Sequence, residues 1–213
     1  DDFGQRLVQL QHTHIFSDRF STTASLYYGG SGGDYLYTYP DTDSTLTQIN
    51  YPLYNDHYGM IVNGFWESEN WQISSGIHGY LFDRVNEESF APDFENPYYR
   101  ETSDKKEVSW FAKAEWSQND FKVFADLQVR TLKLTINPDY SFIGMAPEGP
   151  IVKSWTFVSP KVGISYAFDD HITAYASAGR MGREPTRIDI LGGFRLGAPN
   201  YSQSRADNFD PEY

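Results

Sequence analysis

Apolar and polar residues alternate along most of this chain, and the alternation predicts β-strands rather than helices. Apolar side chains occupy every even position from Val108 to Trp116, and every odd position from Phe121 to Val129. Only a Gln-Asn-Asp segment separates the two runs, and these residue types are typical of tight turns. Because successive side chains of a strand point to opposite faces, this unit is predicted to be a hairpin with one apolar and one polar face.

The same hairpin unit recurs along the chain. Short turns are predicted near positions 17, 69, 119 and 169, about fifty residues apart, which indicates an internal repeat. The segments that join the hairpins are rich in Gly, Pro, Asp and Tyr, and we expect long loops over about residues 29–56, 83–106, 138–154 and 182–213. The prediction is an all-β fold of about eight antiparallel strands, with short turns at one end and long loops at the other.

The apolar face of the predicted sheet favours a membrane barrel over a soluble sandwich. Its large aromatic side chains cluster beside the short turns, and its middle positions are small or aliphatic. A sandwich core would place its bulk at the centre, whereas an outer-membrane barrel carries an aromatic girdle at the membrane interface. The face also lacks Asp, Glu, Lys and Arg, as lipid contact requires. The predicted girdle comprises Phe16, Phe20, Trp66, Trp71, Trp116, Phe121, Tyr166 and Phe168.

The order of turns and loops predicts how the chain lies across a membrane. In bacterial barrels the short turns are periplasmic and the long loops are extracellular. The first predicted strand runs into a short turn and the last one leaves a short turn, so both ends of the chain are expected on the extracellular side. We therefore expect an antiparallel transmembrane β-barrel segment from the interior of a larger barrel, with further strands pairing with both exposed edges.

Composition excludes several other classes of protein. The 213 residues include 29 acidic and 17 basic side chains, and the net charge of -12 argues against nucleic acid as a partner. The absence of cysteine excludes disulfide scaffolds, zinc–thiolate sites and thiol catalysis. No apolar run reaches the ~18 residues of a transmembrane helix. No nucleophile, acid–base pair or ligand cluster stands out, so we predict neither an enzyme nor a resident cofactor or metal.

Two segments resemble the barrel of TonB-dependent outer-membrane receptors. Residues 14–21 read His-Ile-Phe-Ser-Asp-Arg-Phe-Ser, similar to the H-x-F-S-D-x-x-S hairpin of that family, and a Gly/Tyr-rich segment follows. Residues 159–166 resemble its N-P-K-x-G-x-x-Y pattern, although Ser159 replaces the usual Asn. The R-E-P-T-R motif of the family is matched by Arg183, Glu184, Pro185, Thr186 and Arg187.

The resemblance implies a barrel of about 22 strands, a plug, and a motif that engages TonB, the last two expected outside these residues. It also implies import of a scarce nutrient through the bacterial outer membrane, with an iron-siderophore or haem-type complex as the favoured ligand. The implied partners are outer-membrane lipid or lipopolysaccharide, the rest of the barrel and plug, TonB, and a small-molecule or metal-chelate ligand. The alternatives are a glycan-binding surface β-sandwich and a passive structural outer-membrane barrel.

Candidate ligand contacts lie in the predicted loops and lumen. Aromatic loop side chains suit sugars or aromatic chelators, although packing between loops would also explain them. A lumenal histidine is explained either by the polarity of the lumen or by ligand contact. The arginines of the family motif either form ion pairs that hold the wall or contact an anionic ligand. The candidates are Tyr35, Tyr37, Tyr39, His78, Tyr98, Tyr99, Arg183 and Arg187.

Overall fold

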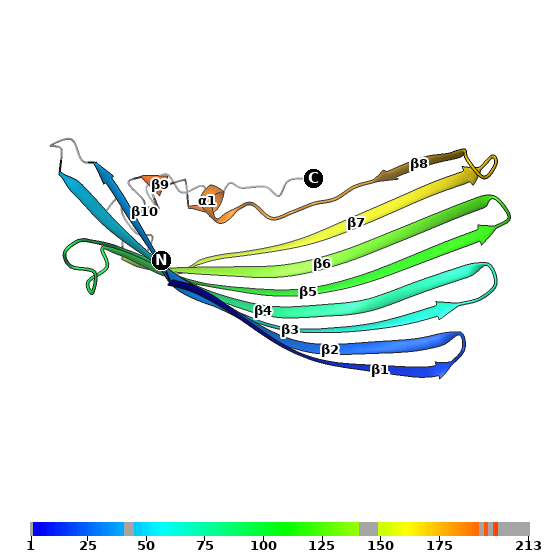
Figure 1. The fold of residues 1–213 in the computed structure, drawn as a ribbon, viewed down its shortest axis with the longest axis horizontal. Helices are drawn as coiled ribbons and strands as arrows, with labels where there is room; N and C mark the ends of the chain where they lie inside the picture. Colours follow the sequence, from blue (N-terminus) through cyan, green and yellow to red (C-terminus); the bar gives the residue numbers. More distant parts are fainter. Residues whose placement is uncertain (1, 41–44, 141–148, 192–193, 196–197, 200–213) are drawn as a thin grey trace.

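Eight long strands form one antiparallel sheet in the computed structural model (Figure 1). The structure describes residues 2–40, 45–140, 149–191, 194–195 and 198–199. Each strand pairs with the next one in the chain, so a single sheet forms in place of the two facing sheets of a sandwich. The strands are β1 (Asp2–Ser17), β2 (Phe20–Pro40), β3 (Leu46–Glu67), β4 (Trp71–Phe90), β5 (Tyr99–Gln118), β6 (Phe121–Tyr140), β7 (Ile151–Ala167) and β8 (Thr173–Gly179).

The four short turns lie together at one end of the sheet, as Figure 1 shows, at residues 18–19, 68–70, 119–120 and 168–172. They coincide with the positions expected from the sequence. Asn119 has a φ of 52°, in the left-handed region that asparagine tolerates better than most residues. In the fourth turn, Asp169 Oδ1 accepts hydrogen bonds from the backbone N–H groups of His171 (2.8 Å) and Ile172 (2.9 Å). Local turn chemistry therefore closes this end of each hairpin.

The expected loops at 29–56 and 83–106 are largely strand, and the sequence-based boundaries are wrong there. β2 continues to Pro40 and β3 begins at Leu46, while β4 and β5 are separated only by residues 91–98. Glycine and aspartate are typical of loops, but here neighbouring rings fill the space that the glycines leave. A Cβ on Gly32, for example, would lie 2.5 Å from the Tyr54 ring. The expected 138–154 loop overlaps β6, which ends at Tyr140, and β7, which begins at Ile151. Of the expected loops, residues 41–44, 141–148, 192–193, 196–197 and 200–213 lie outside the described residues.

The register places six of the expected girdle residues on one face of the sheet, next to the short turns. Phe16 lies at an irregularity of β1 and Phe168 lies in the fourth turn. Phe20 pairs with Trp66, and Trp71 pairs with Trp116. Rings also contact across the turns, with Phe16 and Phe20 centroids 5.2 Å apart. We call this face the outer face and the opposite one the inner face; "distal" denotes the end away from the short turns.

Charged side chains reach the outer face only near the distal end. Lys106 lies on β5 about ten residues from Trp116, and a strand of that length tilted by ~40° rises ~25 Å. This distance matches the apolar band of a membrane barrel. Among the described residues, every position of the outer face between the girdle and this level is uncharged. The first charged outer positions are Arg6, Asp56, Asp83, Lys106 and Lys133, which we call the distal border.

After β8 the chain runs back along the sheet to a short helix, α1 (Arg187–Ile190), as Figure 1 shows. Thr186 and Asp189 form a capping box that begins this helix. Ile190 and Leu191 are buried against Tyr99, Ile136 and Ile151 on the inner face. Residues 183–191, here called the strap, thus form the apolar core with β5, β6 and β7. Two further short strands, β9 (Phe194–Arg195) and β10 (Ala198–Pro199), pair with each other. Among the described residues, no helix is long and apolar enough to cross a membrane.

Candidate ligand-binding site on the inner face

Glu184 of the strap is held between two cations of the inner face. Its carboxylate accepts from Lys105 Nζ and from Arg130 Nη2, each at 2.5 Å. Glu107 lies 3.5 Å from the same lysine and 3.8 Å from the same arginine. Each of the four side chains is less than a quarter exposed, so the attraction is weakly screened. These pairs fix the strap to the middle of the sheet.

Arg187 anchors the far end of the strap. Its Nε donates to the Glu101 carboxylate and its Nη2 donates to the Tyr99 hydroxyl at 2.6 Å. Tyr99 also donates to Glu101, which is fully buried, and Asn86 Nδ2 donates to it at 3.4 Å. A buried carboxylate needs several donors to offset its lost hydration. The hydrogen bonds of Tyr99 and Arg187 with each other and with Glu101 therefore hold the strap against the wall.

His78 belongs to an aromatic and histidine cluster lower on the inner face. The Tyr27 hydroxyl lies 2.7 Å from His78 Nε2 and 3.4 Å from His57 Nε2. Tyr80 packs against both imidazoles, with ring centroids at 4.9 and 5.5 Å, and donates to Glu107 at 2.9 Å. The cluster therefore continues into the ion pairs of the strap. Within the described residues, no three His, Cys, Asp or Glu side chains gather closely enough to hold a metal ion.

Three of the predicted tyrosines, Tyr35, Tyr37 and Tyr39, lie on the inner face of the distal part of β2, and Tyr98 lies in the connection between β4 and β5. Tyr35 and Tyr37 are exposed, and Tyr37 stacks on Tyr39 with centroids 6.0 Å apart. Tyr35 pairs across the strands with Tyr51. Tyr98 instead stacks on Phe90 at 4.4 Å and is half-buried against the strap core. The alternation that was assigned to a loop is thus a row of tyrosines on strand β2, with only part of the set open to a ligand.

Glu88 is buried beside these tyrosines, beyond the distal border. Its side chain is 1% exposed. Burial raises the pKa of the Glu88 carboxyl, and the neighbouring phenols of Tyr98 and Tyr51 only partly oppose that shift. Burial likewise raises the pKa of both phenols. Burial therefore favours the protonated form of the Glu88 carboxyl, against the smaller effect of the two phenols.

We expect the stability of the distal β4–β5 hairpin to fall as pH rises, because of Glu88. A carboxyl whose folded pKa exceeds its unfolded value of about 4.3 stabilises the fold below that unfolded value. This contribution is lost as pH rises through the folded pKa. Thermal unfolding of the wild type and Glu88→Gln between pH 4 and 8 measures the effect. Glu88→Gln should gain stability over the wild type as pH rises, whereas Glu69→Gln, at an exposed turn, should run parallel to the wild type. Parallel profiles for Glu88→Gln would contradict the assignment.

A cavity of about 430 Å³ separates the strap from the wall. Arg84, Lys105 and Arg130 line it from the sheet. The Nε of Arg84 is buried with no hydrogen-bond partner among the described residues, and burial lowers the pKa of its guanidinium. Lining residues from the strap are Arg183, Glu184, Pro185, Thr186 and Arg187. Basic side chains thus outnumber acidic ones in the lining of this cavity, which favours binding of an anionic ligand.

The sequence pattern missed most of the partners that the fold brings to these residues. Lys105, Glu107 and Arg130 were not singled out, although charges at inner positions of neighbouring strands are a signal for ion pairing. Nor did the pattern indicate Tyr27 and His57 beside His78. The structure places the five motif residues 183–187 together in the strap, where they line the cavity over the inner face.

Comparison with known proteins gives one consistent result. The chain matches, over residues 1–213, the sequence profile of the family described as "TonB dependent receptor-like, beta-barrel". By sequence, no curated protein matches it. The fold resembles that of the copper transporter OprC, with a TM-score of 0.74 and 17% identity, over 98% of this chain and 34% of OprC.

Two further structures share the fold. The unliganded ferric citrate transporter FecA has a TM-score of 0.61 and 10% identity, over 94% of this chain and 28% of FecA. BauA, the ferric preacinetobactin receptor from Acinetobacter baumannii, has a TM-score of 0.54 and 12% identity, over 93% of this chain and 33% of BauA. The chain spans about a third of the length of these proteins. The strand order and the whole-length match agree: the chain belongs to the family of TonB-dependent receptor-like β-barrels.

Proposed function

We propose that this chain is a wall segment of a bacterial outer-membrane transporter that takes up an iron-siderophore or haem-type complex. In this proposal the barrel has about 22 strands, and the outer face contacts lipid through the aromatic girdle. The short turns lie in the periplasm and the distal strand extensions lie outside the cell. A plug and TonB complete the transporter, and the ligand enters on the inner face.

The basic cavity under the strap carries the proposal on ligand class. Ferric siderophores and haem present carboxylate, catecholate or propionate oxygens, and the buried Arg84 Nε has no hydrogen-bond partner in the part of the chain that the structure describes. A guanidinium donates well to such oxygens. The exposed Tyr35 and Tyr37 above it offer ring faces to a conjugated chelate. Tyr39, His78, Tyr98 and Arg183 complete the proposed contacts, while Tyr99 and Arg187 act by holding the wall.

Binding of defined chelates to the intact transporter in detergent tests this proposal. We expect an anionic ferric chelate or haem to bind, and Arg84→Gln to weaken that binding about tenfold, the size of one charge-assisted hydrogen bond. Arg6→Gln, on the outer face, is the matched control and should bind as the wild type does. Binding of free copper(II) or of an oligosaccharide alone would contradict the iron assignment, as would equal affinity in Arg84→Gln.

A further inference from the structure

Two lysines stand side by side on the outer face of the distal border. Lys106 of β5 and Lys133 of β6 are direct cross-strand partners, and both are exposed. Like charges directly opposite each other destabilise a sheet. Neither ammonium forms an ion pair or hydrogen bond with another described residue. The pair therefore presents two unsatisfied cations at one point of the outer face, which is the arrangement that binds a polyvalent anion.

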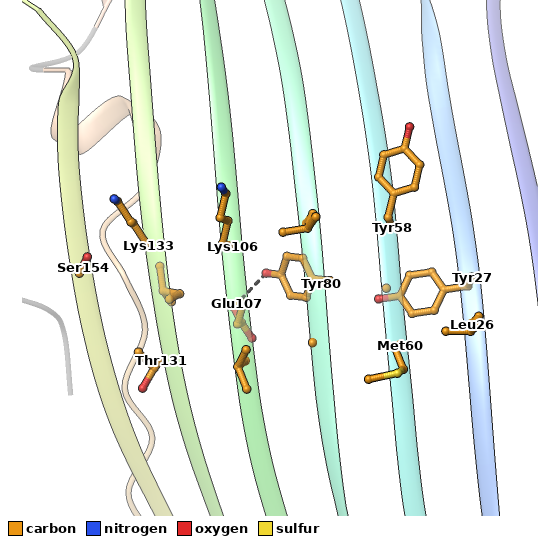
Figure 2. A pocket seen from close by; sticks show the side chains of 15 residues that line it. Leu26, Tyr27, Tyr58, Met60, Tyr80, Lys106, Glu107, Thr131, Lys133 and Ser154 are labelled. Carbon is orange, nitrogen blue, oxygen red and sulfur yellow. Dashed lines mark hydrogen bonds between the residues drawn. The ribbon is translucent and has the colours of Figure 1, made fainter.

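The same cross-strand row supplies hydroxyl groups on either side of the lysines. Leu81 pairs with Lys106 and with Tyr58, and Ser154 pairs with Lys133. In Figure 2 the side chains of Lys106, Lys133 and Tyr58 all extend toward the distal end of their strands. Long amphipathic side chains at a membrane boundary extend in this way to keep their polar ends at the interface. The row thus offers ammonium and hydroxyl donors at a single level.

An apolar groove lies directly below this row. It has a volume of about 720 Å³, within the ~300–1,000 Å³ of pockets that hold small molecules. Gly79 leaves its floor open, since a Cβ there would meet no atom closer than 3.7 Å. The cross-strand partners of Gly79, Met60 and Val108, form the walls of the groove, and Leu26 lies beside them. The missing side chain of one glycine therefore creates a slot for an aliphatic chain.

We propose that this groove and lysine pair form a binding site for a phosphorylated membrane lipid. The phosphate binds between Lys106 and Lys133, and one acyl chain lies in the groove over Gly79. The site stands at the level where headgroups meet hydrocarbon if the outer face contacts lipid, so the inference rests on the proposed membrane orientation. Asp83 and Asp104 form the next cross-strand row toward the distal end. From the girdle toward the distal end, the outer face is therefore first apolar, then basic and then acidic. That order places the anionic group of an amphiphile at the lysines.

Native mass spectrometry of the intact protein in detergent tests this site. The probes are dioleoyl phosphatidic acid, dioleoyl phosphatidylcholine and inorganic phosphate. We expect phosphatidic acid to stay bound at least tenfold better than phosphatidylcholine, and Lys106→Gln/Lys133→Gln to remove that preference. Lys106→Arg/Lys133→Arg should retain it, because arginine also binds phosphate. The control Lys113→Gln/Lys161→Gln removes equal charge from the inner face, where both lysines lie over the Phe124 ring, and should leave the preference unchanged.

Two results would overturn the site. One is equal retention of phosphatidic acid by the wild type and Lys106→Gln/Lys133→Gln. The other is inorganic phosphate binding as tightly as phosphatidic acid, which would show an anion site with no role for the groove. Folding of each variant is checked by heat-modifiable migration on gels. Contact of the outer face with lipid is tested separately by arginine substitutions in β6. A failure of the lipid site is therefore distinguishable from a failure of the proposed function.

Discussion

Glu184→Lys is expected to release the strap from the inner face. The substitution places a third cation beside Lys105 and Arg130, leaving only Glu107 to balance them. Losing one member of a buried ion pair costs about 3–5 kcal/mol. For Glu184→Lys the free-energy cost of undocking the strap should be about 2–3 kcal/mol. It is smaller because the side chains of Glu184, Lys105 and Arg130 each keep about a fifth of their surface exposed. The docked strap should then open about 30- to 150-fold more often.

Limited trypsin digestion measures this release. The peptide bond after Arg187 is shielded in the docked strap by the contacts of that side chain with Glu101 and Tyr99. We expect cleavage there to be at least tenfold faster in Glu184→Lys. Glu115→Lys is the matched control, because Glu115 pairs with Lys113 and Lys122 near the short turns, away from the strap. Equal cleavage rates in Glu184→Lys and the wild type would show that the ion pairs do not hold the strap.

Leu127→Arg is expected to destabilise the inserted barrel. Leu127 lies on the outer face of β6, midway between Phe121 of the girdle and Lys133 of the distal border. Its cross-strand partners are Ala112 and Pro160. An arginine at the middle of a lipid-facing surface costs about 2–4 kcal/mol. A cost of that size is a large fraction of a typical folding free energy. Urea unfolding in lipid vesicles should therefore show a lower midpoint for Leu127→Arg.

The adjacent residue supplies the control for Leu127→Arg. Gln128 faces the opposite side, where Asp126 and Lys161 pair across β6 and β7. Gln128→Arg adds the same charge to the polar inner face and should change the unfolding midpoint little. If both variants lose equal stability, or neither does, the outer face does not contact lipid. That result would contradict the proposed function while leaving the fold unaffected.

Alternation in β5 and β6 was sufficient to predict their faces, because a strand has a period of two residues whatever surrounds it. The six girdle residues from Phe20 to Tyr166 were placed on one face for the same reason. Strand length was not predictable in this way. Gly32 and Asp34 are residues typical of turns, yet both lie inside β2. Gly32 fits the strand because the Tyr54 ring of β3 covers it, a contact that the local sequence does not reveal. Asp34 lies in the same ladder, opposite Pro52.

The inner-face partners were also beyond the reach of the sequence. His78 was a candidate by parity alone, but its contact with Tyr27 depends on two successive registers across β2, β3 and β4. The choice between ion pairing and ligand contact for the 183–187 motif stayed open for the same reason. Glu184 meets Lys105 across 79 residues of chain, and nothing in either segment specifies the other.

The sequence by itself determined the hairpin turns, the charge-free outer face, the aromatic girdle positions and the family, because each depends on residues close together in the chain. The tertiary structure decided how far the strands extend, which tyrosines stay open, and how the strap covers the inner face. It also placed Lys106 opposite Lys133 above a groove that one glycine leaves open. These features depend on register and on the return of the chain after β8, where free energy is gained by contacts between residues distant in sequence.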